Sequence, residues 1–111
     1  MSDNEGKDLF AGMEDGYTYI PNDIFDAVMV VKIHVIQLNM CMHLLRYTYG
    51  CHKEWAAISL HDFAAAMDSN EQWLLVMIES LINRKIIICQ ESKPGENSFY
   101  KINPEVSEWK Y

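Results

Sequence analysis

The sequence has little positive charge. Of its 111 residues only nine are Lys or Arg, against 16 Asp or Glu, so the formal net charge is −7 at pH 7. A surface that binds nucleic acid phosphates normally carries an excess of cations, so this composition argues against strong nonspecific DNA binding. A local basic patch is still allowed, because residues 1–16 hold five of the acidic residues and one lysine and the rest is only mildly acidic.

Cysteine is also scarce. Cys41, Cys51 and Cys89 are an odd number without a CxxC pair, and two of them lie in the apolar runs MCMHLL and IIIC. This pattern favours buried free thiols in a reducing compartment over disulfides. The chain has no apolar signal segment, and no run approaches the ~20 apolar residues of a membrane span. We therefore expect a soluble, cytoplasmic protein without a membrane partner.

Motifs that carry catalysis or bind cofactors are lacking as well. The sequence has no Gly-rich phosphate loop, no HExxH zinc motif and no nucleophile motif. The four histidines are scattered, and the Cys51-His52 pair has no second pair to complete a tetrahedral zinc site. We expect no enzyme activity, no catalytic residues, no metal and no cofactor.

What the sequence does have is hydrophobic side chains, at 50% of its residues, enough for one modest core. Residues 1–16, MSDNEGKDLFAGMEDG, mix Gly with charge and have little apolar periodicity. We interpret them as a flexible acidic N-terminal arm. Residues 17–111 are then the folded domain.

The first half of this domain has the periodicity of two helices. Pro21 and a capping Asn22 precede a helix over 23–31, whose buried side is predicted to hold Ile24, Phe25, Val28 and Val31. A central helix follows at about 34–49, with an apolar stripe of Val35, Leu38, Met42, Leu45 and Tyr49. A second stripe of Ile36, Met40, His43 and Tyr47 lies beside it, so the apolar arc is wide. In this helix Gln37, Asn39, Arg46 and Thr48 are expected to point away from the core. Gly50 is expected to end it in a left-handed conformation.

The second half predicts a helix-turn-helix and a β-hairpin. AAIS is a short extended piece before a helix capped by Ser59 and Asp62, with Leu60, Phe63 and Met67 facing inward. A turn over 68–70, in which Ser69 or Asn70 is the cap, leads to a helix over 71–84. IIICQ and FYKIN then have strand character and flank the turn residues ESKPGENS. The predicted fold is mainly α with a small β-hairpin, a winged helix-turn-helix.

Five segments occur in an order typical of one known family: EDGYTYIPNDIFDA, LLRYTYGCHK, ISLHDFAAAM, NRKIII and KINPEVSEW. Together they cover about residues 14–109, with RYTYG and SEW the more specific signatures. The chain resembles the N-terminal domain of bacteriophage lambda replication protein O and its relatives. The resemblance implies a phage origin, a bacterial host cell, and a winged-helix dimer that binds repeated sites at a replication origin. It also implies that the second helix of the motif reads the major groove.

The helix over 71–84 departs from the family at its outer positions, where relatives usually carry Arg, Lys, Ser and Thr. Here the positions hold Glu71, Gln72, Leu75, Val76 and Glu79. Carboxylates repel phosphates, and Leu and Val cannot bind them. Three interpretations stay open: a helix that is entirely core, with Trp73, Leu74, Met77, Ile78 and Leu81 inward; a protein contact; or DNA reading through the remaining polar groups.

The sequence therefore favours an acidic winged-helix protein that acts by protein–protein contact, with Glu71, Gln72, Leu75, Val76 and Glu79 as the partner-binding residues. The partner would be a basic host nucleic-acid-binding or defence protein, which this chain would inhibit in the manner of a DNA mimic. We also expect a homodimer, because the two long helices carry apolar arcs wider than one partner covers. Appreciable binding to duplex DNA at physiological salt is not expected.

The alternative is a DNA-binding phage replication-initiation or regulatory protein. In that case Lys53, Arg84, Lys85, Lys93 and Lys101 would contact the DNA backbone, and Lys93, beside Pro94-Gly95, would contact it from the wing.

Overall fold

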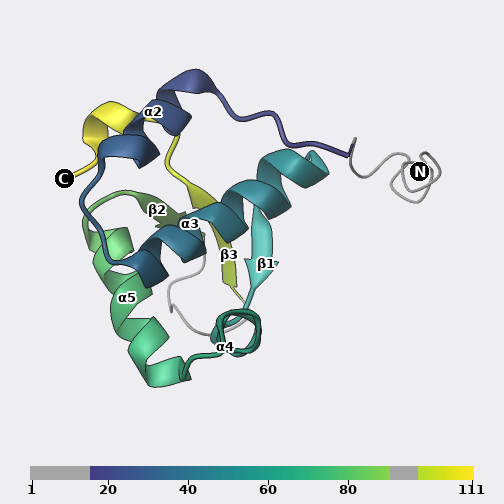
Figure 1. Ribbon diagram of the computed structural model, residues 1–111, viewed down its shortest axis with the longest axis vertical. Helices are drawn as coiled ribbons and strands as arrows, with labels where there is room; N and C mark the ends of the chain where they lie inside the picture. Colours follow the sequence, from purple (N-terminus) through teal and green to yellow (C-terminus); the bar gives the residue numbers. More distant parts are fainter. Residues whose placement is uncertain (1–15, 91–97) are drawn as a thin grey trace.

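The computed structural model describes residues 16–90 and 98–111 (Figure 1). Its helices are α2 (Asn22–Val30), α3 (Val35–Thr48), α4 (Leu60–Met67) and α5 (Glu71–Asn83), with short 3-10 turns η1 (Tyr49–Cys51) and η2 (Val106–Glu108). Its strands are β1 (Ala56–Ile58), β2 (Ile87–Cys89) and β3 (Ser98–Ile102). The order α3, β1, α4, α5, β2, β3 is that of a winged helix-turn-helix, which confirms the predicted fold. The predicted arm over 1–16, apart from Gly16, lies outside the described residues.

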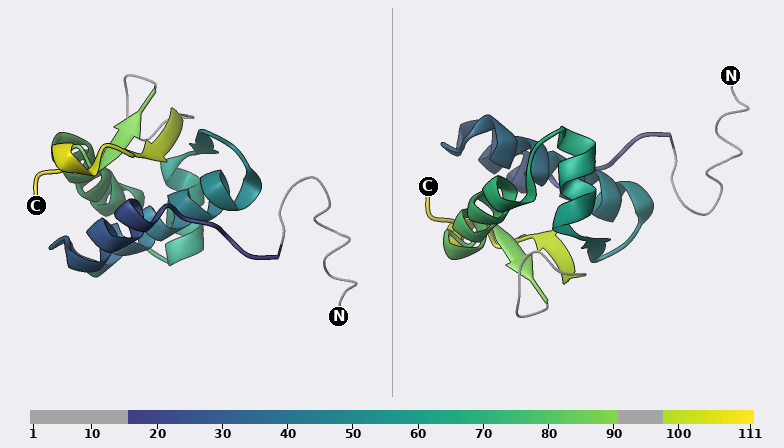
Figure 2. Two further views of the ribbon diagram at one scale, coloured as in Figure 1. Left: turned by 90° about the horizontal axis from the view of Figure 1, so that it is seen from above. Right: turned by 90° about the horizontal axis from the view of Figure 1, so that it is seen from below.

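The three strands form one antiparallel sheet in the order β1-β3-β2. The predicted hairpin is present, with Ile87 opposite Ile102 and Cys89 opposite Tyr100. The predicted extended piece AAIS is a third strand, since Ala57 lies opposite Phe99 on the other edge of β3. Figure 2 shows α2 and α3 on one side of this sheet. The Pro-Gly turn between β2 and β3 lies outside the described residues.

Helix α2 begins one residue earlier than predicted, and its cap differs. Asn22 is inside the helix, Pro21 occupies the N-cap position, and no side chain caps the helix. Pro21 has no N–H and a fixed φ, so it suits the start of a helix without a capping bond. Ile24 is buried as predicted, whereas Phe25 is exposed and Ala27 takes its place in the core.

Of the two stripes predicted for helix α3, Leu45 of the first and Met40 of the second are buried. The buried positions are Gln37, Met40, Cys41, Leu44, Leu45 and Thr48. Val35 and Met42, expected inside, are exposed. The polar residues tolerate burial because they are hydrogen-bonded: the Gln37 side chain accepts from His34 N–H at 2.9 Å and donates to Met77 O at 3.1 Å, and Thr48 donates to Leu44 O at 2.6 Å.

The prediction that Gly50 has a left-handed conformation was wrong. The chain continues from α3 into η1, and His52 is the residue with positive φ, at 56°. Gly50 is instead required by space, because a Cβ there would lie 2.7 Å from Thr18 Oγ1 and 3.1 Å from Arg46 Nη1. The α-helix therefore ends at Thr48, and the 3-10 turn η1 continues one residue past the glycine, to Cys51.

The two helices of the motif are capped as predicted. Ser59 Oγ accepts from Asp62 N–H at 3.1 Å while Asp62 accepts from Ser59 N–H at 3.3 Å. Asn70 Oδ1 accepts from Trp73 N–H at 2.8 Å at the start of α5. Between the helices Asp68 adopts a left-handed conformation, with φ of 52°. This tight turn packs α4 against α5.

One core joins all these elements. Its largest fully buried side chains come from every helix and from both hairpin strands: Ile24, Met40, Leu44, Leu45, Phe63, Leu74, Ile78, Leu81, Ile86, Ile87, Tyr100 and Ile102. The C-terminal segment closes over it, where Trp109 is buried and its indole N–H donates to Asn103 O at 2.9 Å. Burial of this apolar surface is the main stabilising contribution, and it fixes the orientation of α5.

Candidate nucleic-acid interface on helix α5

Helix α5 has a buried face and an exposed face. Leu74, Ile78 and Leu81 are fully buried. The opposite face carries Gln72, Val76, Glu79 and Asn83, at helical spacings of four, three and four, and all four are exposed. The helix is thus neither all core nor all surface, and we call these four residues the outer face.

The predicted partner-binding residues do not all lie on the outer face. Gln72, Val76 and Glu79 do, and Val76 is 55% exposed. Glu71 is exposed beside α4, where its Oε2 lies 3.4 Å from His61 Nδ1. Leu75 is half-buried and packs against the core.

Trp73 was missed as a surface residue. It was grouped with the inward side chains, yet it is 41% exposed and its ring meets that of His34 edge-on at 5.8 Å. His34 precedes α3 and caps it, with Nδ1 accepting from Ile36 N–H at 3.0 Å. The sequence signal for this contact is weak, because the two residues are 39 positions apart.

The cations proposed for the alternative function have different environments. Lys53 and Lys85 are exposed. Lys101 is occupied: its Nζ lies 2.9 Å from Glu54 Oε2 and 4.6 Å from the centre of the Trp55 ring. Lys93 lies outside the described residues.

Arg84, just after α5, holds three segments together. Its Nε donates to Lys110 O at 2.8 Å, and Nη2 donates to Lys32 O at 3.1 Å and to Tyr111 O at 2.8 Å. These bonds use the guanidinium within the protein, so Arg84 is not the free phosphate contact that was expected. They also bring the backbones of Lys32 and Lys110 to the end of α5, beside Lys85.

The electrostatics of α5 are therefore uneven along its length. The helix itself has no Lys or Arg. Its two carboxylates are Glu71, the first residue, and Glu79, the ninth of its 13 residues. The basic residues Lys32, Lys85 and Lys110 come from segments that meet at its C-terminal end, where they suit the helix dipole. Of the residues described, seven are Lys or Arg and nine are Asp or Glu.

Burial perturbs the titration of Cys41 and His43, and neither residue lies on α5. Burial raises the pKa of the Cys41 thiol to about 12, and burial lowers the pKa of His43. Within residues 16–90 and 98–111 no three His, Cys, Asp or Glu side chains gather so as to hold a metal ion. None of the helices in these ranges is long and apolar enough to cross a membrane.

The family model for bacteriophage replication protein O matches residues 9–109, nearly the whole chain. The chain belongs to the bacteriophage replication protein O family. No curated protein and no solved structure matches it. This match confirms the resemblance that the five sequence segments indicated. In the structure, α5 is the second helix of the helix-turn-helix.

Proposed function

We propose that this chain is a DNA-binding factor of phage replication that presents the outer face of α5 to duplex DNA. Membership of the replication protein O family supports this, together with an exposed outer face on the second helix of the motif. The other expectation, an acidic inhibitor of a host defence protein, rested on the missing cations and gains no support from the comparisons. The proposed role is non-catalytic, and it places the chain in the bacterial host, where phage DNA replicates.

The outer face has side chains that can read base edges. Gln72 and Asn83 have the amide groups that pair with adenine in the major groove. Glu79 can accept a hydrogen bond from the amino group of cytosine, and Val76 can contact the methyl group of thymine. The charge argument from the sequence excludes strong phosphate binding by α5, but it does not exclude base reading.

Phosphate contacts would come from the end of the helix. Lys32, Lys85 and Lys110 are exposed and belong to segments that Arg84 ties to the C-terminus of α5. With about three phosphate contacts per protomer, the logarithm of the affinity should fall with the logarithm of salt with a slope of roughly −3. We expect weak nonspecific binding, and specificity that depends on α5.

The test is selection from a random duplex library at low salt, followed by fluorescence anisotropy on the enriched duplex. We expect a preferred sequence to emerge, and Gln72→Ala and Asn83→Ala each to weaken its binding by about tenfold, because each removes one amide–base pair. Gln90→Ala is the matched control, since Gln90 is exposed and lies beyond β2. Failure to enrich any sequence, or equal binding by all three variants, would contradict the proposal.

Glu79→Gln separates base reading from simple charge. Removing this carboxylate should strengthen binding to scrambled duplex, because repulsion from phosphates is relieved. The preference for the selected sequence should fall at the same time if Glu79 reads a cytosine. A variant that gains affinity equally for both duplexes would show that Glu79 takes no part in reading.

A further inference from the structure

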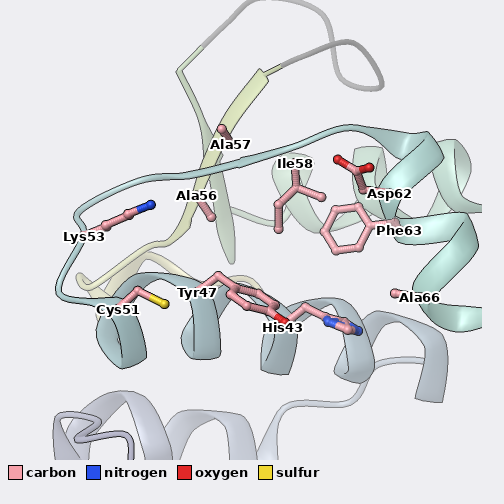
Figure 3. A pocket seen from close by; sticks show the side chains of 10 residues that line it. All are labelled: His43, Tyr47, Cys51, Lys53, Ala56, Ala57, Ile58, Asp62, Phe63 and Ala66. Carbon is pink, nitrogen blue, oxygen red and sulfur yellow. The ribbon is translucent and has the colours of Figure 1, made fainter. Parts of the chain in front are cut away.

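A cavity of about 370 Å³ lies on the side of the molecule formed by α3, β1 and α4 (Figure 3). This volume falls within the range of small-molecule sites, about 300–1,000 Å³. One wall is α3, which contributes His43 and Tyr47, and the other is β1 with the start of α4. None of the residues assigned to DNA reading on α5 lines it.

The wall from α3 is aromatic and flat. The rings of His43 and Tyr47 are one helical turn apart, with centroids 6.3 Å apart and planes only 7° from parallel. The Phe63 ring closes the inner end, meeting His43 edge-on at 6.1 Å. Tyr47 is 47% exposed, although a large aromatic side chain of a small domain is more often covered. Two nearly parallel rings beside a cavity offer a surface on which another flat ring can stack.

Polar groups stand at both ends of the opening. Figure 3 shows Lys53 at one end and Asp62 at the other, with the side chains of β1 between them. The Lys53 backbone is fixed by its N–H, which donates to Thr48 O at 2.9 Å. Its ammonium has no hydrogen bond or ion pair within the described ranges, unlike that of Lys101. Arg46 adds a second cation nearby, with its guanidinium 5.4 Å from the centre of the Tyr47 ring.

The strand that borders the cavity also has a free edge. β1 pairs with β3 on one side, and in the described sheet it is the outermost strand on the other. An edge strand offers backbone N–H and C=O groups to whatever lies beside it. The cavity thus combines a stacking wall, hydrogen-bonding groups of both kinds and a free cation.

We propose that this cavity binds a nucleotide, with its base against the His43–Tyr47 wall and its phosphate beside Lys53. Base stacking on aromatic side chains needs no particular sequence, because every base has a π face. The carboxylate of Asp62, at the far end, suits a base with an exocyclic amino group. The same chemistry is present in a free mononucleotide and in an unpaired base of a single strand. This site does not depend on α5 binding duplex DNA.

The experiment titrates dAMP into the ¹⁵N-labelled protein and follows amide shifts by NMR. In parallel, fluorescence anisotropy measures the binding of a fluorescein-labelled single-stranded deoxyadenosine oligonucleotide. We expect millimolar dAMP to shift amides of α3, β1 and α4 around the cavity, and not those of α5. Tighter binding of the oligonucleotide than of dAMP identifies an unpaired strand as the source, whereas equal binding identifies the free nucleotide.

Three variants and one control test the assignment. Tyr47→Leu keeps an apolar side chain but removes the ring, and it should weaken binding by about tenfold. Lys53→Gln should weaken dAMP binding more than adenosine binding, because adenosine has no phosphate. Tyr17→Leu changes an exposed tyrosine that does not line the cavity and should leave the affinity unchanged. Ala66→Trp, which fills the opening from α4, should abolish binding and covers the case in which Tyr47→Leu fails to fold.

Three results would overturn the proposal. The first is the absence of shifts around the cavity with both dAMP and the oligonucleotide. The second is unchanged affinity in Tyr47→Leu, Lys53→Gln and Ala66→Trp. The third is inorganic phosphate alone reproducing the dAMP shifts at the same concentration, which would leave no role for the base.

Discussion

At the scale of single residues, burial strongly perturbs the thiol of Cys41. It lies on the buried stripe of α3, and burial raises its pKa from 9.0 to about 12 because the thiolate would lose its hydration. The thiol is therefore inert in the folded protein at neutral pH, and it acts as a small apolar side chain. Cys51 and Cys89 are less buried.

This raised pKa makes stability depend on alkaline pH. Above pH 9 the unfolded chain releases the Cys41 proton while the folded chain retains it, so the unfolded state binds fewer protons and stability falls as pH rises. The loss should approach about 1.4 kcal/mol per pH unit between the two pKa values. Urea unfolding at several pH values measures it. Cys41→Ala should have a shallower decline, and parallel declines in the two proteins would contradict the assignment.

Single-residue patterns predicted the N-terminal caps of α4 and α5, but not the start of α2 or the end of α3, and they predicted burial less well. Ser59, Asp62 and Asn70 cap α4 and α5 as expected, because capping depends on neighbours three residues away. Gln37 and Thr48 were expected outside and are buried. Their partners, Met77 O and Leu44 O, are backbone groups that the pattern of apolar residues does not reveal.

At the scale of elements, α3 and α5 are joined by a polar contact inside an apolar interface. Gln37 is the link: its Oε1 accepts from His34 N–H in the cap of α3, and its Nε2 donates to Met77 O in the middle of α5. The contact fixes the position of the central helix relative to the helix that carries the outer face. It thus connects the core to the proposed function.

Replacing Gln37 by Leu should destabilise the protein by about 1–2 kcal/mol. The volume is nearly kept, but the His34 N–H loses its acceptor at the start of the helix and the bond to α5 is lost. Chemical denaturation at neutral pH measures the change. Asn39→Leu, at an exposed position of the same helix, should alter stability by about 0.5 kcal/mol or less. Equal or greater stability of Gln37→Leu would show that the polar link contributes nothing.

The order of the helices and strands was predictable, because each element depends on a pattern of neighbouring residues. The contacts between the elements were not predictable from such patterns. The hairpin, the helix-turn-helix and the extended piece before Ser59 were all read from neighbouring residues. The pairing of β1 with β3 joins segments about 40 residues apart, and the cavity beside β1 depends on that pairing. For the same reason the sequence did not indicate that Arg84 would bond to Lys32 O and Lys110 O.

At the scale of the whole molecule, exposed apolar side chains stand on both sides of the loop between α2 and α3 and at the start of α5. Val30 ends α2, Val35 begins α3, and Trp73 of α5 contacts His34 between them; all three apolar residues are exposed. We call these three residues the apolar flank. Trp73 lies beside the outer face of α5 and not on it, since it is about a quarter turn from Gln72. A second copy could therefore cover the flank while the outer face stays free for DNA.

The predicted homodimer is thus expected to form through the apolar flank. Sedimentation equilibrium at micromolar concentration should give about twice the chain mass of 12.9 kDa, because covering exposed apolar side chains is favourable. Val35→Lys should produce a folded monomer, since a charge would have to be buried in the interface. Tyr17→Lys, at an exposed aromatic position elsewhere, should remain a dimer.

Val76→Lys decides between the two exposed surfaces of α5. A dimer is expected, whereas a monomer would place the interface on the outer face, where it would compete with DNA. Leu75→Lys should instead lower stability, because Leu75 packs against the core. A single species of 12.9 kDa in the unmodified protein would rule out the dimer and leave the flank open to another partner.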